Sequence, residues 1–217
     1  MEVSFSTKLK SFFYPVTLKI VSNDRHQRLS LQLYCNQFML STHDAVYSFG
    51  TFYTPFRKTF SLIKKEIAHC KSFLLLGTGL GSALKILQQK HHLYPDSVLV
   101  DNDNDILDLS INYMNLNSKN NVSWKYTDAL NYLQTTTQTF DLIGVDVFRD
   151  TFIPKDYKQL YFFELCKKTL NTGGYCIFNM ILKSSNEKMI IAERLRIVFS
   201  TVKEITFKMN TFYICSY

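Results

Sequence analysis

Three glycines at alternate positions have the spacing needed to cradle a nucleotide-like compound. Gly77, Gly79 and Gly81 follow the apolar run FLLL and precede a segment with helical spacing. Glycine allows positive φ angles and a close approach of the backbone to a ligand, and the N-terminus of the following helix presents free N–H groups. The pattern predicts a strand–loop–helix turn, including Thr78, that binds such a ligand; an ordinary tight turn is the alternative.

Carboxylates follow the next two strand-like runs, where the same ligand would extend. Asp101 follows SVLV and lies 20 residues beyond Gly81, a position from which a carboxylate can accept hydrogen bonds from both hydroxyls of a ribose. We predict ribose binding at Asp101 and its neighbour Asn102. Asp128 follows VSWKY and either accepts a hydrogen bond from an adenine amino group or caps the next helix. The first alternative would also place Ala129 in the site.

A third carboxylate, Asp146, follows the apolar run FDLIGV. In α/β sheets, ligands gather at the carboxyl ends of the strands. We therefore predict that Asp146 belongs to the site, as a polar wall or as a weak base.

Aromatic residues gather ahead of a predicted helix and form a second candidate part of the site. Tyr47, Phe49, Phe52 and Tyr53 lie within seven positions of one another. They either line a substrate pocket, where ring faces can cover a cation, or pack in the core and between domains. Tyr47 and Phe49 are the candidate substrate-binding residues.

The segments that would position these residues alternate between strands and helices from residue 72 onward. The strand-like runs are SFLLL, SVLV, VSWKY, FDLIGV and YCIFNM, and each is followed by a helical pattern. This alternation predicts a mostly parallel sheet covered by helices on both faces. Two further runs, TVKEITFKM and TFYICSY, are separated only by about Asn210. They must be antiparallel, because parallel neighbours need a crossover of about a dozen residues or more.

The N-terminal part has a different pattern. Apolar residues alternate between Val16 and Leu40, which predicts a small antiparallel β segment. A Thr-Pro pair then marks the start of a helix whose apolar residues continue at helical spacing to Ile67. We predict a β segment at residues 1–53 and an α/β domain at residues 54–217.

Composition and charge limit the classes of partner. The chain has 217 residues, 46% hydrophobic content and a net charge of +7. Residues 73–150, which hold the candidate site, carry 9 acidic and 5 basic residues, a net charge of −4. The field there favours a cation, so we expect a small-molecule substrate and no nucleic acid partner.

The cysteines, histidines and apolar runs argue against several other classes. The five scattered cysteines predict reduced, mostly buried thiols, and neither they nor the histidines have zinc-ligand spacing, so no metal is expected. A membrane span would need about 18 consecutive apolar residues, and the chain has no such run and no signal peptide pattern. We expect a cytoplasmic protein.

The motifs together resemble one family. LLLGTGLGS, VLVDND, TDALNYL, FDLIGVDVFRD and TLNTGGYCIF are similar, in order and interval, to the spermidine synthase branch of the class I S-adenosylmethionine (SAM) dependent methyltransferase fold. The resemblance implies a doubly wound, mostly parallel, seven-stranded sheet with an antiparallel last strand. It implies binding of SAM or decarboxylated SAM by Gly77 to Gly81, Asp101 and Asp128, a reaction centre after FDLIGV, and a homodimer formed through the N-terminal β segment.

Two departures separate the chain from family members that make spermidine. Those members carry an Asp-x-x-Asp segment whose second aspartate binds and deprotonates the attacking amine. Here Arg149 stands at that position, and Asp150 could take the role only if the loop shifts by one residue. Like charges about 4 Å apart repel by about 4 kcal/mol at an effective dielectric of about 20, so the exchange would cost a cationic amine up to about 8 kcal/mol. The acid that grips the far amine is also absent, at Phe49-Gly50-Thr51.

Methyl transfer from SAM to a small acceptor is therefore the leading hypothesis. An in-line displacement at carbon needs chiefly correct placement, and it needs no strong base when the acceptor is already nucleophilic. Aminopropyl transfer of the spermidine synthase type is the second hypothesis. A pseudoenzyme that keeps the fold to bind a nucleoside or a partner is the third, and the terminal hairpin argues against an NAD-dependent reductase.

Overall fold

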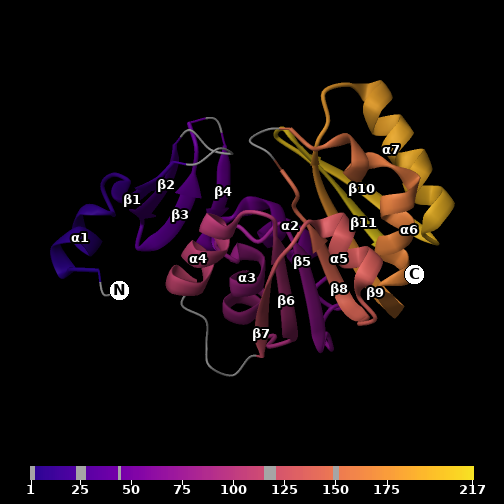
Figure 1. Cartoon of the computed structure of the whole chain (residues 1–217), viewed down its shortest axis with the longest axis horizontal. Coiled ribbons are helices and arrows are strands. Elements are labelled where there is room, and N and C mark those ends of the chain that lie inside the picture. Colours follow the sequence, from indigo (N-terminus) through magenta and orange to yellow (C-terminus); the bar gives the residue numbers. More distant parts are fainter. Residues whose placement is uncertain (1–2, 23–27, 44, 115–120, 149–151) are drawn as a thin grey trace.

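A computed structural model of the chain places its strands in two sheets (Figure 1). It describes residues 3–22, 28–43, 45–114, 121–148 and 152–217. The small sheet and α1 lie at one end of the molecule, and the large sheet with its helices forms the rest. Within the described ranges, no helix has both the length and the apolar character needed to cross a membrane.

The small sheet is antiparallel throughout, as predicted. The N-terminal elements are α1 (Phe5–Lys10), β1 (Val16–Val21), β2 (Leu29–Tyr34), β3 (Gln37–Ser41) and β4 (Val46–Phe49), and the four strands lie in sequence order across the sheet. The sequence did not predict α1, because this helix buries no side chain and so leaves no apolar stripe.

The large unit follows after a short 3-10 helix, η1 (Gly50–Phe52). Its elements are α2 (Thr54–Leu62), β5 (Ser72–Leu76), α3 (Ser82–His91), β6 (Asp96–Asp101), α4 (Asn104–Tyr113), β7 (Val122–Tyr126), α5 (Ala129–Thr135), β8 (Phe140–Val145), the 3-10 helix η2 (Lys155–Lys158), α6 (Leu160–Lys168), β9 (Leu170–Ile181), α7 (Ser185–Val198), β10 (Thr201–Phe207) and β11 (Asn210–Ser216).

Strand order confirms the predicted fold class. The large sheet has seven strands in the order β10-β11-β9-β8-β5-β6-β7, and β11 runs antiparallel to both of its neighbours. The chain builds outward from β5 in two directions, toward β6 and β7 on one side and toward β8 and β9 on the other. The carboxyl ends of β5, β6 and β8 therefore meet where the direction changes, which is the usual place for a ligand in a doubly wound sheet.

The two faces of the large sheet are covered by different helices. In β5, Phe73 and Leu75 pack on the side of α2 and α3, whereas Leu74 and Leu76 pack on the side of α5, α6 and α7. Every one of these four side chains is at most 1% exposed. Such burial on both faces requires the continuous apolar run seen in the sequence, and it fixes the end of β5 below the glycine loop.

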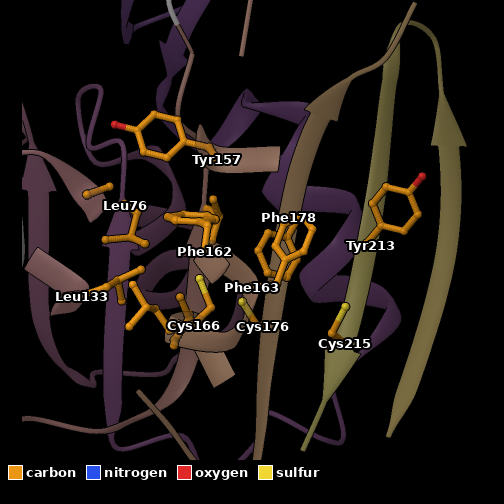
Figure 2. Close-up of a cluster of buried hydrophobic side chains, with 14 of the residues drawn as sticks. Leu76, Leu133, Tyr157, Phe162, Phe163, Cys166, Cys176, Phe178, Tyr213 and Cys215 are labelled. Carbon is orange, nitrogen blue, oxygen red and sulfur yellow. The ribbon is translucent and has the colours of Figure 1, made fainter. Parts of the chain in front are cut away.

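The core beneath α6 and α7 is rich in aromatic rings and thiols (Figure 2). Phe163 lies 6.2 Å from Phe162 and 5.2 Å from Phe178, ring centroid to ring centroid. Cys176 and Cys215 lie in the same cluster, and burial raises the pKa of both thiols well above the usual value. These cysteines therefore act as small apolar core residues, as the sequence predicted.

The end of α2 differs from the sequence-based prediction. Apolar spacing predicted one helix reaching Ile67, but α2 ends at Leu62 and the chain continues in turns. Ile63 and Ile67 are nevertheless buried, because successive turns place both side chains on the same core. Spacing alone cannot separate a helix from a run of turns that buries the same residues. The division of domains at residue 53 stays a prediction.

Candidate functional site

A cavity of about 970 Å³ lies at the carboxyl ends of β5, β6 and β8, and β4, η1 and the β10–β11 turn close its other sides. Its volume is in the range of pockets that hold cofactor-sized ligands. The sequence-predicted residues that line it are Tyr47, Phe49, Gly77, Gly79, Asp101, Asn102, Asp128, Ala129 and Asp146. The topology thus brings most of the predicted site together.

The glycine loop is packed closely against two other backbone segments, one at Asp146 and one at Tyr47. Gly77 has φ +85°, and a Cβ atom there would lie 2.2 Å from the carbonyl oxygen of Asp146. Gly79 has φ +50°, and its Cβ would lie 2.8 Å from the carbonyl oxygen of Tyr47. Both positions accept only glycine without rearrangement. Gly81 does not line the cavity; it has φ +68° and begins α3 as its N-cap.

The small sheet is attached to this loop by hydrogen bonds. The hydroxyls of Ser48 and Ser82 are 2.5 Å apart, and the Phe49 N–H donates to Ser82 Oγ over 3.0 Å. The end of β4 is therefore fixed against the first turn of α3. This contact holds Phe49 at the cavity wall, where it also stacks on Tyr34 with ring centroids 5.9 Å apart.

Asp101 is held by backbone donors on both oxygens. Oδ2 accepts from the Thr78 N–H at 2.8 Å, and Oδ1 accepts from the Asp103 N–H at 3.0 Å. Burial raises the pKa of Asp101 to about 6, and these two hydrogen bonds act in the opposite direction. Thr78 thus shapes the site through its backbone and does not itself line the cavity. The fixed carboxylate keeps lone pairs that can accept from ribose hydroxyls.

Asp128 caps α5, so the capping alternative is confirmed. Its Oδ1 accepts from the N–H groups of Leu130 at 2.8 Å and Asn131 at 3.3 Å. Its Oδ2 accepts from the Tyr157 hydroxyl of η2, whose pKa is raised by burial and by Asp128. Because Asp128 and Tyr157 both line the cavity, they close the end near β6 and β7. Contact with an adenine stays a prediction.

Asp146 stands in a chain of side chains that we call the Asp146 network: Tyr53, Asp146, Asn179 and Asn210. The Tyr53 hydroxyl donates to Asp146 Oδ2 at 2.8 Å, and Asn179 Nδ2 donates to Oδ1 at 2.7 Å. Asn210 Nδ2 in turn donates to Asn179 Oδ1 at 2.8 Å. Burial raises the pKa of Asp146 to about 6 and that of Tyr53 well above its usual value. The carboxylate is oriented by neutral donors and can accept a further proton.

Sequence reasoning found only part of this network. Tyr53 was recognised as one aromatic among four, without a role for its hydroxyl. Asn179 carried a signal, since it is a polar residue inside the apolar run YCIFNM. Asn210 was interpreted only as a turn residue, and nothing in the sequence pointed to Tyr157. Arg149 and Asp150, the predicted substrate and second catalytic residues, lie outside the described residues.

The comparisons with known proteins agree with this geometry. The spermine/spermidine synthase domain model matches residues 59–217. The chain belongs to this family. The resemblance inferred from the motifs is therefore confirmed. A search among curated proteins finds no significant match.

Solved structures of this family and of methyltransferases share the fold. A probable spermidine synthase from Corynebacterium glutamicum is 18% identical, has a TM-score of 0.76, and is matched over 94% of this chain and 81% of that one. A spermidine synthase in complex with the transition state analogue AdoDATO is 14% identical, with a TM-score of 0.66 over 93% and 73%. Human methyltransferase-like protein 13 in complex with SAH is 17% identical, with a TM-score of 0.61 over 70% and 75%.

In this spermine/spermidine synthase family member the cavity is strongly acidic. Its charged lining comprises Asp101, Asp103, Asp128, Asp146, Asp156 and Lys208, the one lysine or arginine among the described residues of the lining. Carboxylates gathered around a partly enclosed cavity produce a negative potential that favours a cationic ligand. The net acidity predicted for the middle third of the sequence is thus concentrated at the site.

Replacing Asp146 with asparagine should stabilise the unliganded protein at pH 8. The folded state raises the pKa of Asp146 from 3.8 to about 6, so ionisation opposes folding above pH about 6. An asparagine can accept from Asn179 and donate to the Tyr53 oxygen without this charge. We expect a gain of up to about 3 kcal/mol in the free energy of unfolding, measured by urea denaturation.

The raised pKa of Asp146 in the folded state also fixes how the stabilisation by Asp146→Asn varies with pH. The stabilisation should be full above pH about 6 and disappear as the pH falls below about 4, where Asp146 becomes protonated in both the folded and the unfolded state. Asp96→Asn, at the exposed start of β6, is the control and should change stability little. Destabilisation by Asp146→Asn at pH 8 would contradict the interpretation of the network.

Proposed function

We propose that the protein is a transferase that binds an adenosyl sulfonium compound in the cavity and moves an alkyl group to a small-molecule acceptor. One observation carries this proposal: the glycine loop of β5, the fixed carboxylate of Asp101 and the Asp146 network converge on a single acidic cavity. Membership of the spermine/spermidine synthase family supports it.

The residues present fit an adenosyl group. Gly77 and Gly79 let the backbone approach a ligand at a place where a Cβ would meet other backbone atoms. Asp101 would hold the ribose, and the segment at Asp128 and Ala129 would face the base. Asp146 lies across β5 from Asp101, because β6 and β8 flank that strand. We call the side of Asp101 and Asp128 the nucleoside end, and the side of the Asp146 network the acceptor end.

When bound, the sulfonium supplies an alkyl carbon whose bond to sulfur breaks, with both electrons going to sulfur, as the acceptor lone pair forms the new bond. The chain orients this displacement rather than taking part covalently. Asp146 places a negative charge beside the sulfonium and can accept the proton that the acceptor releases. Tyr53 and Asn179 hold its two oxygens in one orientation, so the carboxylate needs no rearrangement during the reaction.

Methyl transfer from SAM is the first form of this proposal. A diamine acceptor would need a carboxylate for each of its two cationic groups. At the acceptor end, Asp146 is the one acid among the described lining residues. The other acids belong to the nucleoside end: Asp101 ends β6, Asp103 follows it, and Asp128 accepts a hydrogen bond from Tyr157, next to Asp156. Aminopropyl transfer is the second form, and the acidic lining favours it because decarboxylated SAM carries one more net positive charge than SAM.

The nucleoside product released from the donor distinguishes methyl transfer from aminopropyl transfer, even when the acceptor is not known. Calorimetry with SAM, decarboxylated SAM, methylthioadenosine and NAD should show binding of adenosyl sulfur compounds and none of NAD. Incubation with each sulfonium donor and a pool of cellular metabolites should then release S-adenosylhomocysteine if methyl is transferred, or methylthioadenosine if aminopropyl is transferred, as measured by mass spectrometry. Binding without either product would favour the pseudoenzyme, and binding of NAD alone would overturn the proposal.

A further inference from the structure

The turn between β10 and β11 places a lysine at the acceptor end. Lys208 and Met209 form this turn and line the cavity, and the next residue, Asn210, belongs to the Asp146 network. Lys208 has φ +54°, a conformation that suits glycine or asparagine better than lysine. A two-residue hairpin turn requires a positive φ at its first position, so the turn itself accounts for this backbone conformation.

The charge of Lys208 contrasts with the rest of the lining. The other charged lining residues within the described ranges are aspartates, and Asp146 is the one among them at the acceptor end. Lys208 forms no ion pair with an acid in the described part of the chain. Its Nζ lies 5.7 Å from the ring centroid of Phe207, and Lys58 Nζ lies 3.0 Å from the same centroid. A second cation near Lys208 would therefore be repelled, and an anionic group would be attracted.

Apolar side chains surround the Asp146 network on several elements. Each is a close sequence neighbour of a network member: Phe52 precedes Tyr53, Phe148 follows Asp146 by two positions, Ile181 follows Asn179 by two positions on the same face of β9, and Met209 precedes Asn210. All four line the cavity. Phe148 and Ile181 are partly buried, whereas Phe52 and Met209 are 39% and 67% exposed. The acceptor end thus has an apolar rim that is open to solvent, with one fixed carboxylate and one lysine beside it.

Resting on the proposed function, we infer that the acceptor is a small molecule with an apolar body and a carboxylate group, and that Lys208 binds this carboxylate. The apolar body lies among Phe52, Phe148, Ile181 and Met209, and the nucleophilic atom lies at Asp146. Lys208 is then the residue that selects an acidic acceptor over a polyamine, because the polyamine would bring a cation against it.

Two probes that share one apolar body and differ in charge test this inference. We would measure the binding of 3-phenylpropanoate and 3-phenylpropylamine by calorimetry, with the protein saturated with S-adenosylhomocysteine. In the wild type, the propanoate should gain affinity from Lys208, whereas the amine should gain none from it. Lys208→Met should weaken the propanoate by about tenfold, the loss of roughly one charge-assisted contact. Lys203→Met, on the exposed side of β10, is the charge-matched control and should bind like the wild type.

The possible outcomes are separable. No binding of the propanoate, an equal loss of propanoate and amine binding in Lys208→Met, or an equal loss in Lys203→Met and Lys208→Met would overturn the role of Lys208. Failure of the proposed function would appear earlier, as absence of binding by any adenosyl compound to the wild type. Adenosyl binding together with an unaffected Lys208→Met variant would remove this inference and leave the transferase proposal standing.

Discussion

Asp101→Asn should weaken the binding of S-adenosylhomocysteine by about 100-fold or more. Both oxygens of Asp101 accept backbone N–H groups, from Thr78 and Asp103. An asparagine would turn its NH₂ group toward one of these donors, and it would offer the ribose a weaker, uncharged acceptor. Hydrogen bonds to a charged group are worth about 1.5–3 kcal/mol each, and about 2.7 kcal/mol corresponds to 100-fold in affinity.

Calorimetry at pH 8 would measure this loss, with Asp96→Asn at the opposite end of β6 as the matched control. In the wild type, affinity should also fall as the pH is lowered through about 6, because protonation of Asp101, whose pKa is about 6, removes an acceptor that the ribose needs. If Asp101→Asn bound the nucleoside within threefold of the wild type, ribose binding at the end of β6 would be excluded.

Gly77→Ala should destabilise the fold far more than an alanine at another positive-φ glycine. A Cβ at Gly77 would lie 2.2 Å from the Asp146 carbonyl oxygen, which is fixed because the Asp146 N–H donates to Leu76 O at 2.8 Å. Gly173 has a similar φ, +80° against +85°, but nothing lies within 4 Å of its Cβ position. A comparison of Gly77→Ala with Gly173→Ala therefore separates the cost of an unfavourable φ angle from the cost of a steric clash.

Thermal unfolding would measure both variants. Strain alone costs about 1–2 kcal/mol, and 1 kcal/mol lowers Tm by about 2–4 °C in a domain of this size. We expect Gly173→Ala to lose a few degrees, and Gly77→Ala to lose about 10 °C or more or to fail to fold. Equal shifts in the two variants would show that the end of β8 can move away from the glycine loop.

The sequence predicted the site best where topology alone brings residues together. Parallel strands place their carboxyl ends at one edge, so Asp101, Asp128 and Asp146 could be assigned to one cavity from three separate runs. The antiparallel pairing of β10 and β11 was predictable because so short a connection allows no crossover. These inferences needed only strand direction and order.

Contacts between side chains on distant elements could not be predicted in the same way. The hydrogen bond from Tyr53 to Asp146 spans 93 residues, and the bond from Asn179 spans 33. Their existence depends on how the start of α2 and strand β9 pack beside β8, which no local pattern encodes. Lys208 was missed for a related reason, since its relevance comes from the place of its turn beside Asn210 rather than from its neighbours in sequence.

The attachment of β4 to α3 has a consequence for recombining this protein with its relatives. A chimaera joined at residue 53 would take Ser48 and Ser82 from different parents. The backbone carbonyl of residue 47, which packs closely against Gly79, would also come from the other parent. Tyr53 would likewise meet an unfamiliar carboxylate. The crossover that preserves these matched surfaces lies upstream of Val46, so that the last strand of the small sheet is inherited together with the glycine loop that it contacts.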